Sequence, residues 1–388
     1  MKMEKIPARK QFKLRNLDVF PNTILSPMDG VTDAPFRRLC RVLSGNRMGL
    51  LVSEFVPTDG DAVFNPEGHK QLRFFPEERP FGVQIFGRFP DRMADAARKI
   101  AERYRPEYIE VNAGCPAPKV AGKGSGSGLL RDLPRLQEIL HEVRKTLDTC
   151  GVDLPLTLKC RIGWDSDSIN VMETLAIAEG EGVEMLTVHG RTRLQGYNGL
   201  ADWEWIGKVA AAAKIPVIGN GDVNSVEVAR ERIDNYGVAG VAIGRGAMHN
   251  PWIFGQIADA WEGKPAHEIS AVEALDVFPL YYKFKLEDGS TEMGALGRLK
   301  QLGARLCKGF CLDERGSGVD CAGDESQDVA MHIRQTLLTA QNAEEFFGRL
   351  DELRNGFAKE LRYDPSRLVN LNGAKETELK FGDQFKGR

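Results

Sequence analysis

Eight short apolar runs, each followed by an amphipathic stretch, dominate the first two thirds of the chain between residues 22 and 244. The runs are four to seven residues long and apolar nearly throughout, as in strands buried on both faces of a parallel sheet. Stretches between them, such as residues 91–104 and 131–147, carry apolar side chains at the i, i+3, i+4 and i+7 spacing of helices. The runs are NTILSPM, GLLVSEF, PFGVQIF, EYIEVN, PLTLKC, VEMLTVH, IPVIGN and VAGVAIG.

Eight strand–helix units in about 240 residues are the number and size of a (β/α)8 TIM barrel. A doubly wound sheet is the alternative, because periodicity does not show whether a sheet closes. A barrel also predicts that chemically active side chains follow the carboxyl ends of the strands, and polar residues do end these apolar runs. The residues at these ends are Met28, Asp29, Glu54, Gln84, Asn112, Lys159, His189, Asn220, Gly221, Asp222, Gly244 and Arg245.

The pattern changes after residue 262, where amphipathic helices replace the strands. We therefore expect the α/β barrel to be followed by a small all-α helical domain. In that domain the apolar residues of 296–310 share one helical face, and the glycine-rich, acidic segment 311–327 reads as an exposed loop. The expected organisation is a basic arm at 1–19, a barrel at 20–262, a helical domain at 263–360 and a polar tail at 361–388.

Composition excludes several classes of protein. No apolar run approaches the ~20 residues of a membrane span, and the polar first fifteen residues lack the apolar centre of a secretory signal. Seven cysteines without a pattern indicate reduced thiols, so we expect a cytoplasmic protein. Cys307, Cys311, Cys321 and His332 match no compact zinc spacing, so no structural metal is expected. The net charge of −3 weighs, at face value, against a nucleic-acid partner.

The segment VNAGCPAPKVAGKGSGSGLL places Cys115 in a loop shortly after the fourth apolar run. Prolines stiffen this loop, and four glycines permit close approach of its backbone to a ligand. A cysteine in a core is usually a small buried apolar residue, but turn-forming neighbours make that reading poor for Cys115. An ordinary thiol is mostly protonated at pH 7, so Cys115 can act as a general acid.

Two glycine motifs, IGNGDV and IGRGAM, end the seventh and eighth runs. In barrels this position often binds a phosphate, to which Arg245 could add a charge-assisted hydrogen bond. Lys159 and His189 end the fifth and sixth runs and should point into the barrel mouth. Gln84 offers both a donor and an acceptor to the edge of a heterocycle.

Seven motifs in register resemble the tRNA-dihydrouridine synthases. The resemblance covers residues 20–262, with a helical region in the expected place after the barrel. One departure is Ala113, where the family usually carries a bulkier residue. The motifs are SPMDGVTDAPFR, VQIFG, VNAGCPAP, LTLKCRIGW, TVHGRTRLQGYNGLADW, IGNGDV and AIGRGAM.

This resemblance implies an FMN enzyme that reduces the C5–C6 double bond of particular uridines in tRNA with NADPH as reductant. Hydride would pass from reduced FMN to C6, and Cys115 would give a proton to C5. Pro27, Met28 and Asp29 would border the flavin, and Gln84, Lys159 and His189 would contact its ring. Asn220, Gly221, Asp222, Gly244 and Arg245 would hold the ribityl and phosphate end, and Asn112 and Arg191 would lie at the substrate.

A basic stripe in the helical region is the candidate contact for the tRNA backbone. Arg298, Arg305 and Lys308 fall on one side of a helix beside its apolar face. A solvated helix face is the alternative reading of the same stripe.

Two further functions remain open at this point. A small-molecule FMN barrel resembling dihydroorotate dehydrogenases or old yellow enzymes would explain Cys115 but not the helical region. An RNA-binding protein that has lost catalysis would show damage at the thiol or flavin positions, and none is visible. We expect a monomer.

Overall fold

The computed structural model describes residues 10–59, 64–312, 324–356 and 361–365, and it divides into two units. The first comprises Met1–Ala247 with Pro251–His267, and the second comprises Met248–Asn250 with Glu268–Arg388. Each unit is described by itself. None of the helices among the described residues combines the length and the apolar character needed to span a membrane.

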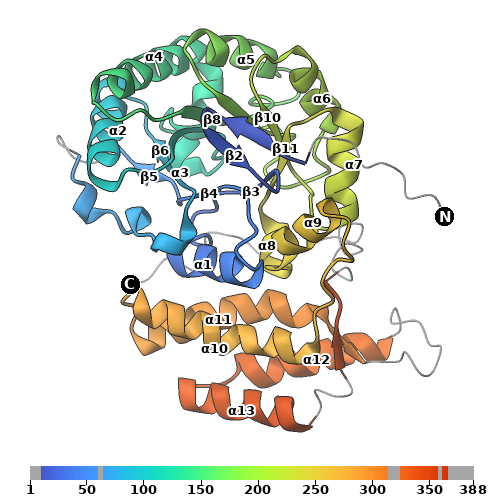
Figure 1. Ribbon diagram of the computed structural model, residues 1–388. Helices are drawn as coiled ribbons and strands as arrows, with labels where there is room; N and C mark the ends of the chain where they lie inside the picture. Colours follow the sequence, from blue (N-terminus) through green and yellow to red (C-terminus); the bar gives the residue numbers. More distant parts are fainter. Residues whose placement is uncertain (1–9, 60–63, 313–323, 357–360, 366–388) are drawn as a thin grey trace. The chain divides into compact units, whose positions relative to one another are not determined.

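The first unit is built on a nine-stranded sheet in which every pairing is parallel, and its helices surround the sheet (Figure 1). A parallel bridge between Ile24 and Leu50 joins the two ends of the strand order, so the sheet closes into the predicted (β/α)8 barrel. All eight predicted strands are present, the second of them as two short pieces. In chain order they are β3 (Thr23–Leu25), β4 (Leu51–Val52), β5 (Val56–Pro57), β6 (Phe81–Phe86), β7 (Tyr108–Ala113), β8 (Leu156–Arg161), β9 (Met185–His189), β10 (Val217–Asn220) and β11 (Gly240–Ile243).

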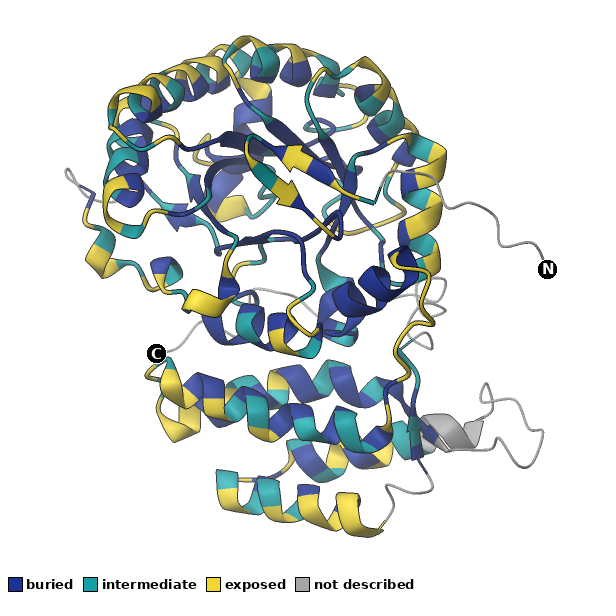
Figure 2. Ribbon diagram, viewed as in Figure 1, coloured by how far each residue is buried: buried dark blue, intermediate teal, exposed yellow. Residues whose placement is uncertain are grey.

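Four of the helices between the strands begin at a capping side chain. The side chains of Asp33, Asp132, Asp202 and Ser225 each accept a hydrogen bond from the backbone N–H three residues later. Most of these helices bury one face and expose the other, whereas the strands, and the helix of residues 253–261, are buried almost throughout (Figure 2). The helices of this part of the chain are α1 (Ala34–Leu43), α2 (Pro90–Tyr104), α3 (Pro118–Ala121), α4 (Leu133–Thr149), α5 (Val171–Gly180), α6 (Trp203–Ala212), α7 (Val226–Tyr236), α8 (Arg245–His249) and α9 (Ile253–Trp261).

The expected basic arm at 1–19 is wrong for its second half. Residues 12–19 form an antiparallel hairpin of β1 (Phe12–Leu14) and β2 (Leu17–Val19), which lies across the ring of strands in Figure 1. Phe12, Leu14 and Val19 are buried in one apolar cluster with Tyr108 and Met185, the first residues of β7 and β9. Apolar side chains alternate with polar ones along the hairpin, so they share one face. This face packs on the first residues of the barrel strands, and the hairpin therefore closes the amino end of the barrel. Residues 1–9 lie outside the described residues.

The second unit is helical, as expected; among its described residues it contains four longer helices and a short antiparallel strand pair that the sequence analysis missed. The predicted apolar face of 296–310 is buried, but its helix ends at Leu306. The expected exposed loop 311–327 is wrong at its two ends, since Cys311 is a buried strand residue and residues 324–327 begin a helix. Residues 313–323 lie outside the described residues. The elements are α10 (Ala271–Glu287), α11 (Glu292–Leu306), β12 (Phe310–Leu312), α12 (Asp324–Leu338), α13 (Ala343–Gly356) and β13 (Leu361–Tyr363).

Candidate active site

The carboxyl ends of the barrel strands bring polar side chains from distant parts of the chain together. Asn112 on β7 pairs in register with Lys159 on β8, and Asn220 on β10 pairs with His189 on β9. The Lys159 Nζ donates to Asn220 Oδ1 at 2.9 Å, which joins two strands that are not neighbours. The mouth of the barrel is therefore a convergent polar site, as the fold predicts.

The Cys115 loop is held by contacts from three sides. Asn112 Oδ1 accepts the backbone N–H groups of Gly114 and Cys115 at 2.9 and 3.0 Å. The hydroxyl of Ser127 donates to the Cys115 carbonyl at 2.7 Å, and Arg161 Nε donates to the Gly114 carbonyl at 2.9 Å. These bonds fix the backbone that carries the thiol, even though the segment is a loop.

A glycine is required where the loop folds back on the cysteine. Gly126 has a φ of +57°, and a Cβ at this position would lie 2.9 Å from Val120 Cγ1 and 3.1 Å from Cys115 Cβ. Both the backbone conformation and the close approach exclude larger side chains. The glycine-rich segment therefore encloses the thiol, as the sequence pattern indicated.

The environment keeps Cys115 protonated at neutral pH. Burial raises the pKa of the thiol, and the nearby Asp29 carboxylate raises it further. The cations of Arg161 and Lys119 oppose this effect without cancelling it. Because a protonated thiol can donate a proton, the site offers a general acid at this position.

Lys159 and His189 respond to the same surroundings in the opposite direction. Burial lowers the pKa of Lys159 to about 8, although the buried Glu110 carboxyl partly offsets it. Burial, together with the charges of Arg161 and Lys159, lowers the pKa of His189 well below its ordinary value. The imidazole is therefore neutral near pH 7, whereas the lysine carries a charge that is easily lost.

Sequence reasoning missed Glu110 and Arg161. Their side chains are 2% exposed, and Arg161 donates to the carbonyls of Gly114, Thr192 and Gly196. A charged residue inside an otherwise apolar run, EYIEVN or LTLKCR, was the available signal. Charged groups are rarely buried without a specific partner, so such a residue marks a functional position.

The predicted phosphate end forms a compact turn at the ends of β10 and β11. Gly221 has a φ of +130°, and a Cβ there would lie 2.5 Å from Ala201 Cβ. Asp222, at φ +55°, accepts hydrogen bonds from Arg191 Nη2 at 2.8 and 2.9 Å and from the Ala201 N–H at 2.8 Å. Arg245 Nη2 approaches the same carboxylate at 3.3 Å. Asp222 therefore anchors this loop instead of facing a ligand phosphate.

Arg191 has a different place from the one expected for a tRNA contact. Its side chain is 2% exposed and donates to Asp222 and to the carbonyls of Asn198 and Gly199. These bonds join the loop at residues 198–199 to Asp222 at the barrel mouth. A buried, ion-paired guanidinium is poorly placed to bind an RNA phosphate, so we assign Arg191 a positioning role.

The remaining predicted site residues are divided between the two units: four lie in the first unit and three in the second. Pro27 and Met28 follow β3 and are half-buried. Asp29 is exposed, and its Oδ2 atom lies 3.9 Å from Lys119 Nζ. Gly244 follows the last residue of β11, and a Cβ there would lie 3.4 Å from Met28 Sδ. Arg298, Arg305 and Lys308 are half-buried on α11 and the turn after it, and Arg298 donates to Gln301 at 3.1 Å.

Metal coordination has no support among the described residues, where no three His, Cys, Asp or Glu side chains gather as a metal site requires. Cys321, one of the four residues considered for such a site, lies outside the described residues.

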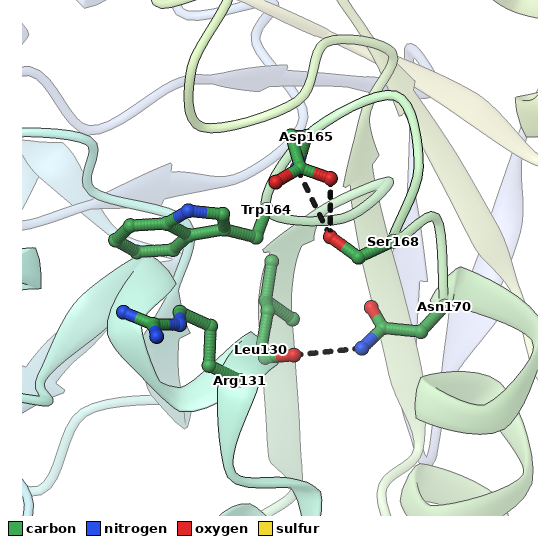
Figure 3. Close-up of a pocket in the computed structure, with 6 residues that line it drawn as sticks. All are labelled: Leu130, Arg131, Trp164, Asp165, Ser168 and Asn170. Carbon is green, nitrogen blue, oxygen red and sulfur yellow. Dashed lines mark hydrogen bonds between the residues drawn. The ribbon is translucent and has the colours of Figure 1, made fainter.

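A cavity of about 540 Å³ lies beside the barrel mouth between the turn at 126–131 and the loop after β8 (Figure 3). The indole of Trp164 lies near the guanidinium groups of Arg131 and Arg193, at 4.8 and 4.7 Å. Asn170 Nδ2 donates to the Leu130 carbonyl at the cavity floor. Its lining contains none of the residues predicted for the active site. It comprises Leu130, Arg131, Trp164, Asp165, Ser168 and Asn170.

Comparisons with known proteins agree with this arrangement. A family model described as dihydrouridine synthase matches residues 24–310. A probable tRNA-dihydrouridine synthase of Rhodobacter capsulatus is 39% identical over 292 residues, which are 75% of this chain and 87% of the relative. The tRNA-dihydrouridine synthase B of Pseudomonas putida is 42% identical over 269 residues, or 68% of this chain and 75% of the relative.

The structure of histamine dehydrogenase from Rhizobium sp. 4-9 shares the fold of the barrel. The TM-score is 0.52 at 9% sequence identity, and the match covers 71% of this chain and 50% of that one.

Proposed function

Because the chain belongs to the dihydrouridine synthase family, we propose that it reduces specific uridines of tRNA to 5,6-dihydrouridine, with FMN as cofactor and NADPH as reductant. The names of its relatives support tRNA as the substrate. The observation that carries the proposal is the Cys115 thiol, which is half-buried, kept protonated and fixed by Asn112 at the barrel mouth.

The donor set at the mouth fits FMN. Lys159, Arg161 and Arg245 place three cations near His189, and this positive field suits a flavin phosphate and an electron-rich ring. Arg191 also acts on His189, but its charge is paired with Asp222. Gly244 is partly exposed and has no Cβ to block a ligand, in the manner of phosphate-binding turns, whereas the buried Gly221 and Gly246 let Ala201 and Val223 pack closely. When bound, FMN would supply the hydride chemistry.

In this proposal the protein holds the flavin at two ends. Lys159 and the neutral His189 contact the ring, while Pro27, Met28 and Asp29 border it. Gln84, which the sequence predicts at the ring, is 0% exposed and bonds to Glu110 and Asn112, so it lies beneath the site. Asn220, Gly221, Gly244 and Arg245 hold the ribityl and phosphate end. Asp222 stays a predicted neighbour of that end, with its carboxylate committed to Arg191 and Ala201. Its role is to hold the loop, because a carboxylate cannot donate a hydrogen bond to a phosphate.

The proton for C5 of the pyrimidine comes from Cys115 Sγ. The loop contacts hold the thiol at a fixed position, so a base that enters the mouth meets an oriented acid. A uridine stacked inside a helix could not reach this position. The substrate must therefore be an unstacked nucleotide that is splayed out of a tRNA loop.

Contacts to the tRNA backbone are assigned to the C-terminal unit, for which 263–360 are the proposed bounds. Arg298, Arg305 and Lys308 carry this part of the proposal, because they lie on one side of α11 and the following turn. Such contacts position an RNA without reading its sequence, and their strength falls as salt rises.

The experiment is to incubate the purified protein with NADPH and tRNA from cells that lack this gene, and to map dihydrouridine by mass spectrometry. We expect a yellow protein with an FMN spectrum and dihydrouridine at particular positions. A colourless protein that FMN cannot reconstitute would contradict the proposal. So would an FMN-loaded enzyme that reduces free pyrimidines but leaves tRNA unchanged.

A further inference from the structure

A chain of three buried polar side chains runs beneath the Cys115 loop. Gln84 Nε2 on β6 donates to Glu110 Oε1 on β7 at 2.7 Å. Asn112 Nδ2 donates to Gln84 Oε1, also at 2.7 Å. The exposed fractions of Glu110, Gln84 and Asn112 are 2%, 0% and 6%. The chain is therefore part of the barrel interior, away from the solvent.

The direction of this chain is fixed at both ends by groups that have only one role. Glu110 Oε1 accepts from Gln84 Nε2, so Gln84 turns its NH₂ group toward Glu110. Burial raises the pKa of Glu110 to about 7, and above that pH the ionised carboxylate can only accept. The Gln84 oxygen then faces Asn112, which must present its own NH₂ group. That leaves Asn112 Oδ1 for the backbone N–H groups of Gly114 and Cys115, which can only donate.

We propose that Glu110 is a positioning residue that sets the direction of the Glu110–Gln84–Asn112 chain and thereby holds the backbone of Cys115. The contacts exist whatever the reaction is, and only the reason for holding the thiol rests on the proposed function. An amide that turned over would place an NH₂ group against the Cys115 N–H, which would leave both donors unsatisfied. The carboxylate prevents this from inside the barrel.

Reversing the chain tests the proposal. Asn112→Asp puts a carboxylate at each end of Gln84, so both ends demand the single NH₂ group and one contact is lost. Adding Glu110→Gln removes the conflict, because the new amide can turn its own NH₂ group toward Gln84 Oε1. Gln84 then reverses and donates to the carboxylate introduced at position 112, which still accepts from the Cys115 N–H.

The readout is the alkylation rate of Cys115 by iodoacetamide, followed by peptide mass spectrometry in the FMN-loaded full chain. Loss of one net hydrogen bond corresponds to roughly a threefold to tenfold change. We expect Asn112→Asp to speed alkylation about tenfold and the double variant to return within about threefold of wild type. A double variant that reacts as fast as Asn112→Asp, or faster, would overturn the proposal.

A second pair of variants serves if Asn112→Asp does not fold. Glu110→Gln offers Gln84 either end of an amide and no longer sets the direction, so it should speed alkylation by up to about twofold, while Glu110→Leu removes the acceptor and should speed the reaction severalfold. Thr187→Val is the matched control. It removes a buried hydroxyl that has no hydrogen-bond partner among the described residues, and it should change nothing. Equal rates for Glu110→Leu and Thr187→Val would overturn the proposal.

Enzyme kinetics separate this inference from the proposed function. For dihydrouridine formation, Glu110→Leu should lower kcat while KM for tRNA stays within about twofold, because the thiol is displaced and the RNA contacts are intact. A rise in KM without a change in kcat would contradict the positioning role. If wild-type protein reduces no tRNA, the proposed function fails, while the alkylation series still decides the role of Glu110.

Discussion

The two ends of the barrel are built from the same strands but contain opposite kinds of side chain. At the amino end, Phe12, Leu14 and Val19 of the hairpin close the strands with an apolar cluster. At the carboxyl end, Lys159, Arg161 and Glu110 are charged or titratable groups withdrawn from water. Burial of apolar surface stabilises a fold, whereas burial of a charge costs free energy.

The two ends of the barrel therefore have different tasks: the amino end contributes to the stability of the fold, and the carboxyl end contributes the reactive groups. The amino end supplies packing that the mouth does not, and the mouth keeps perturbed groups that a catalyst needs. Variants at the amino end should therefore change the free energy of unfolding. Variants at the mouth should change activity at little or no cost to stability.

The largest stability effect should come from the hairpin. Leu14→Ala removes a side chain that is 1% exposed, so it should lower the free energy of unfolding by about 3 kcal/mol. Urea denaturation followed by circular dichroism measures this. Asp18→Ala, an exposed position in the same hairpin, is the control and should stay within about 0.5 kcal/mol of wild type. Equal effects of the two variants would show that the hairpin does not close the barrel.

A smaller effect of opposite sign is expected at the mouth. Lys159→Met should raise the free energy of unfolding at pH 7 by about 1 kcal/mol and weaken FMN binding. The wild-type lysine is charged there at a cost, which partial exposure and the bond to Asn220 reduce. A loss of stability in Lys159→Met would contradict the comparison of the two ends.

The pH dependence of that stability difference has a definite sign. The folded-state pKa of Lys159 is lowered to about 8, so the unfolded chain binds more protons between pH 8 and its ordinary value of 10.5. Wild-type stability should therefore rise relative to Lys159→Met as the pH increases from 8 to 10. Unfolding curves at pH 7, 8 and 9.5 check this, and a constant difference would rule out the lysine as its source.

The smallest effect concerns the thiol itself. Because burial raises the pKa of Cys115, its alkylation rate should still be rising at pH 9, whereas an unperturbed thiol is largely converted to thiolate by then. A plateau below pH 8.5 would mean that Cys115 is an activated nucleophile and not a proton donor.

The sequence was sufficient for the barrel and for most of the mouth. Apolar runs ending in polar residues predict both the strands and the edge at which Lys159, His189 and Asn220 meet, because parallel strands share one carboxyl end. The position of Cys115 followed from the turn-forming residues around it.

Tertiary partners decided the rest. The alternation of FKL and LDV is too short to predict a hairpin, and only the open barrel end explains its burial. Arg191 reads as a surface cation until Asp222 is placed beside it. Glu110 was not singled out in the run EYIEVN, because its role depends on Gln84, which is 26 residues away in sequence.

The central claim is that Cys115 is the proton donor of the reaction at the barrel mouth, and the dihydrouridine content of tRNA after a single turnover tests it most directly. We predict that Cys115→Ala lowers the rate at least about 100-fold while FMN and tRNA remain bound, the size expected for loss of a general acid. Cys150→Ala, a half-buried thiol after α4, is the matched control and should react like wild type. A wild-type rate in Cys115→Ala would contradict the account.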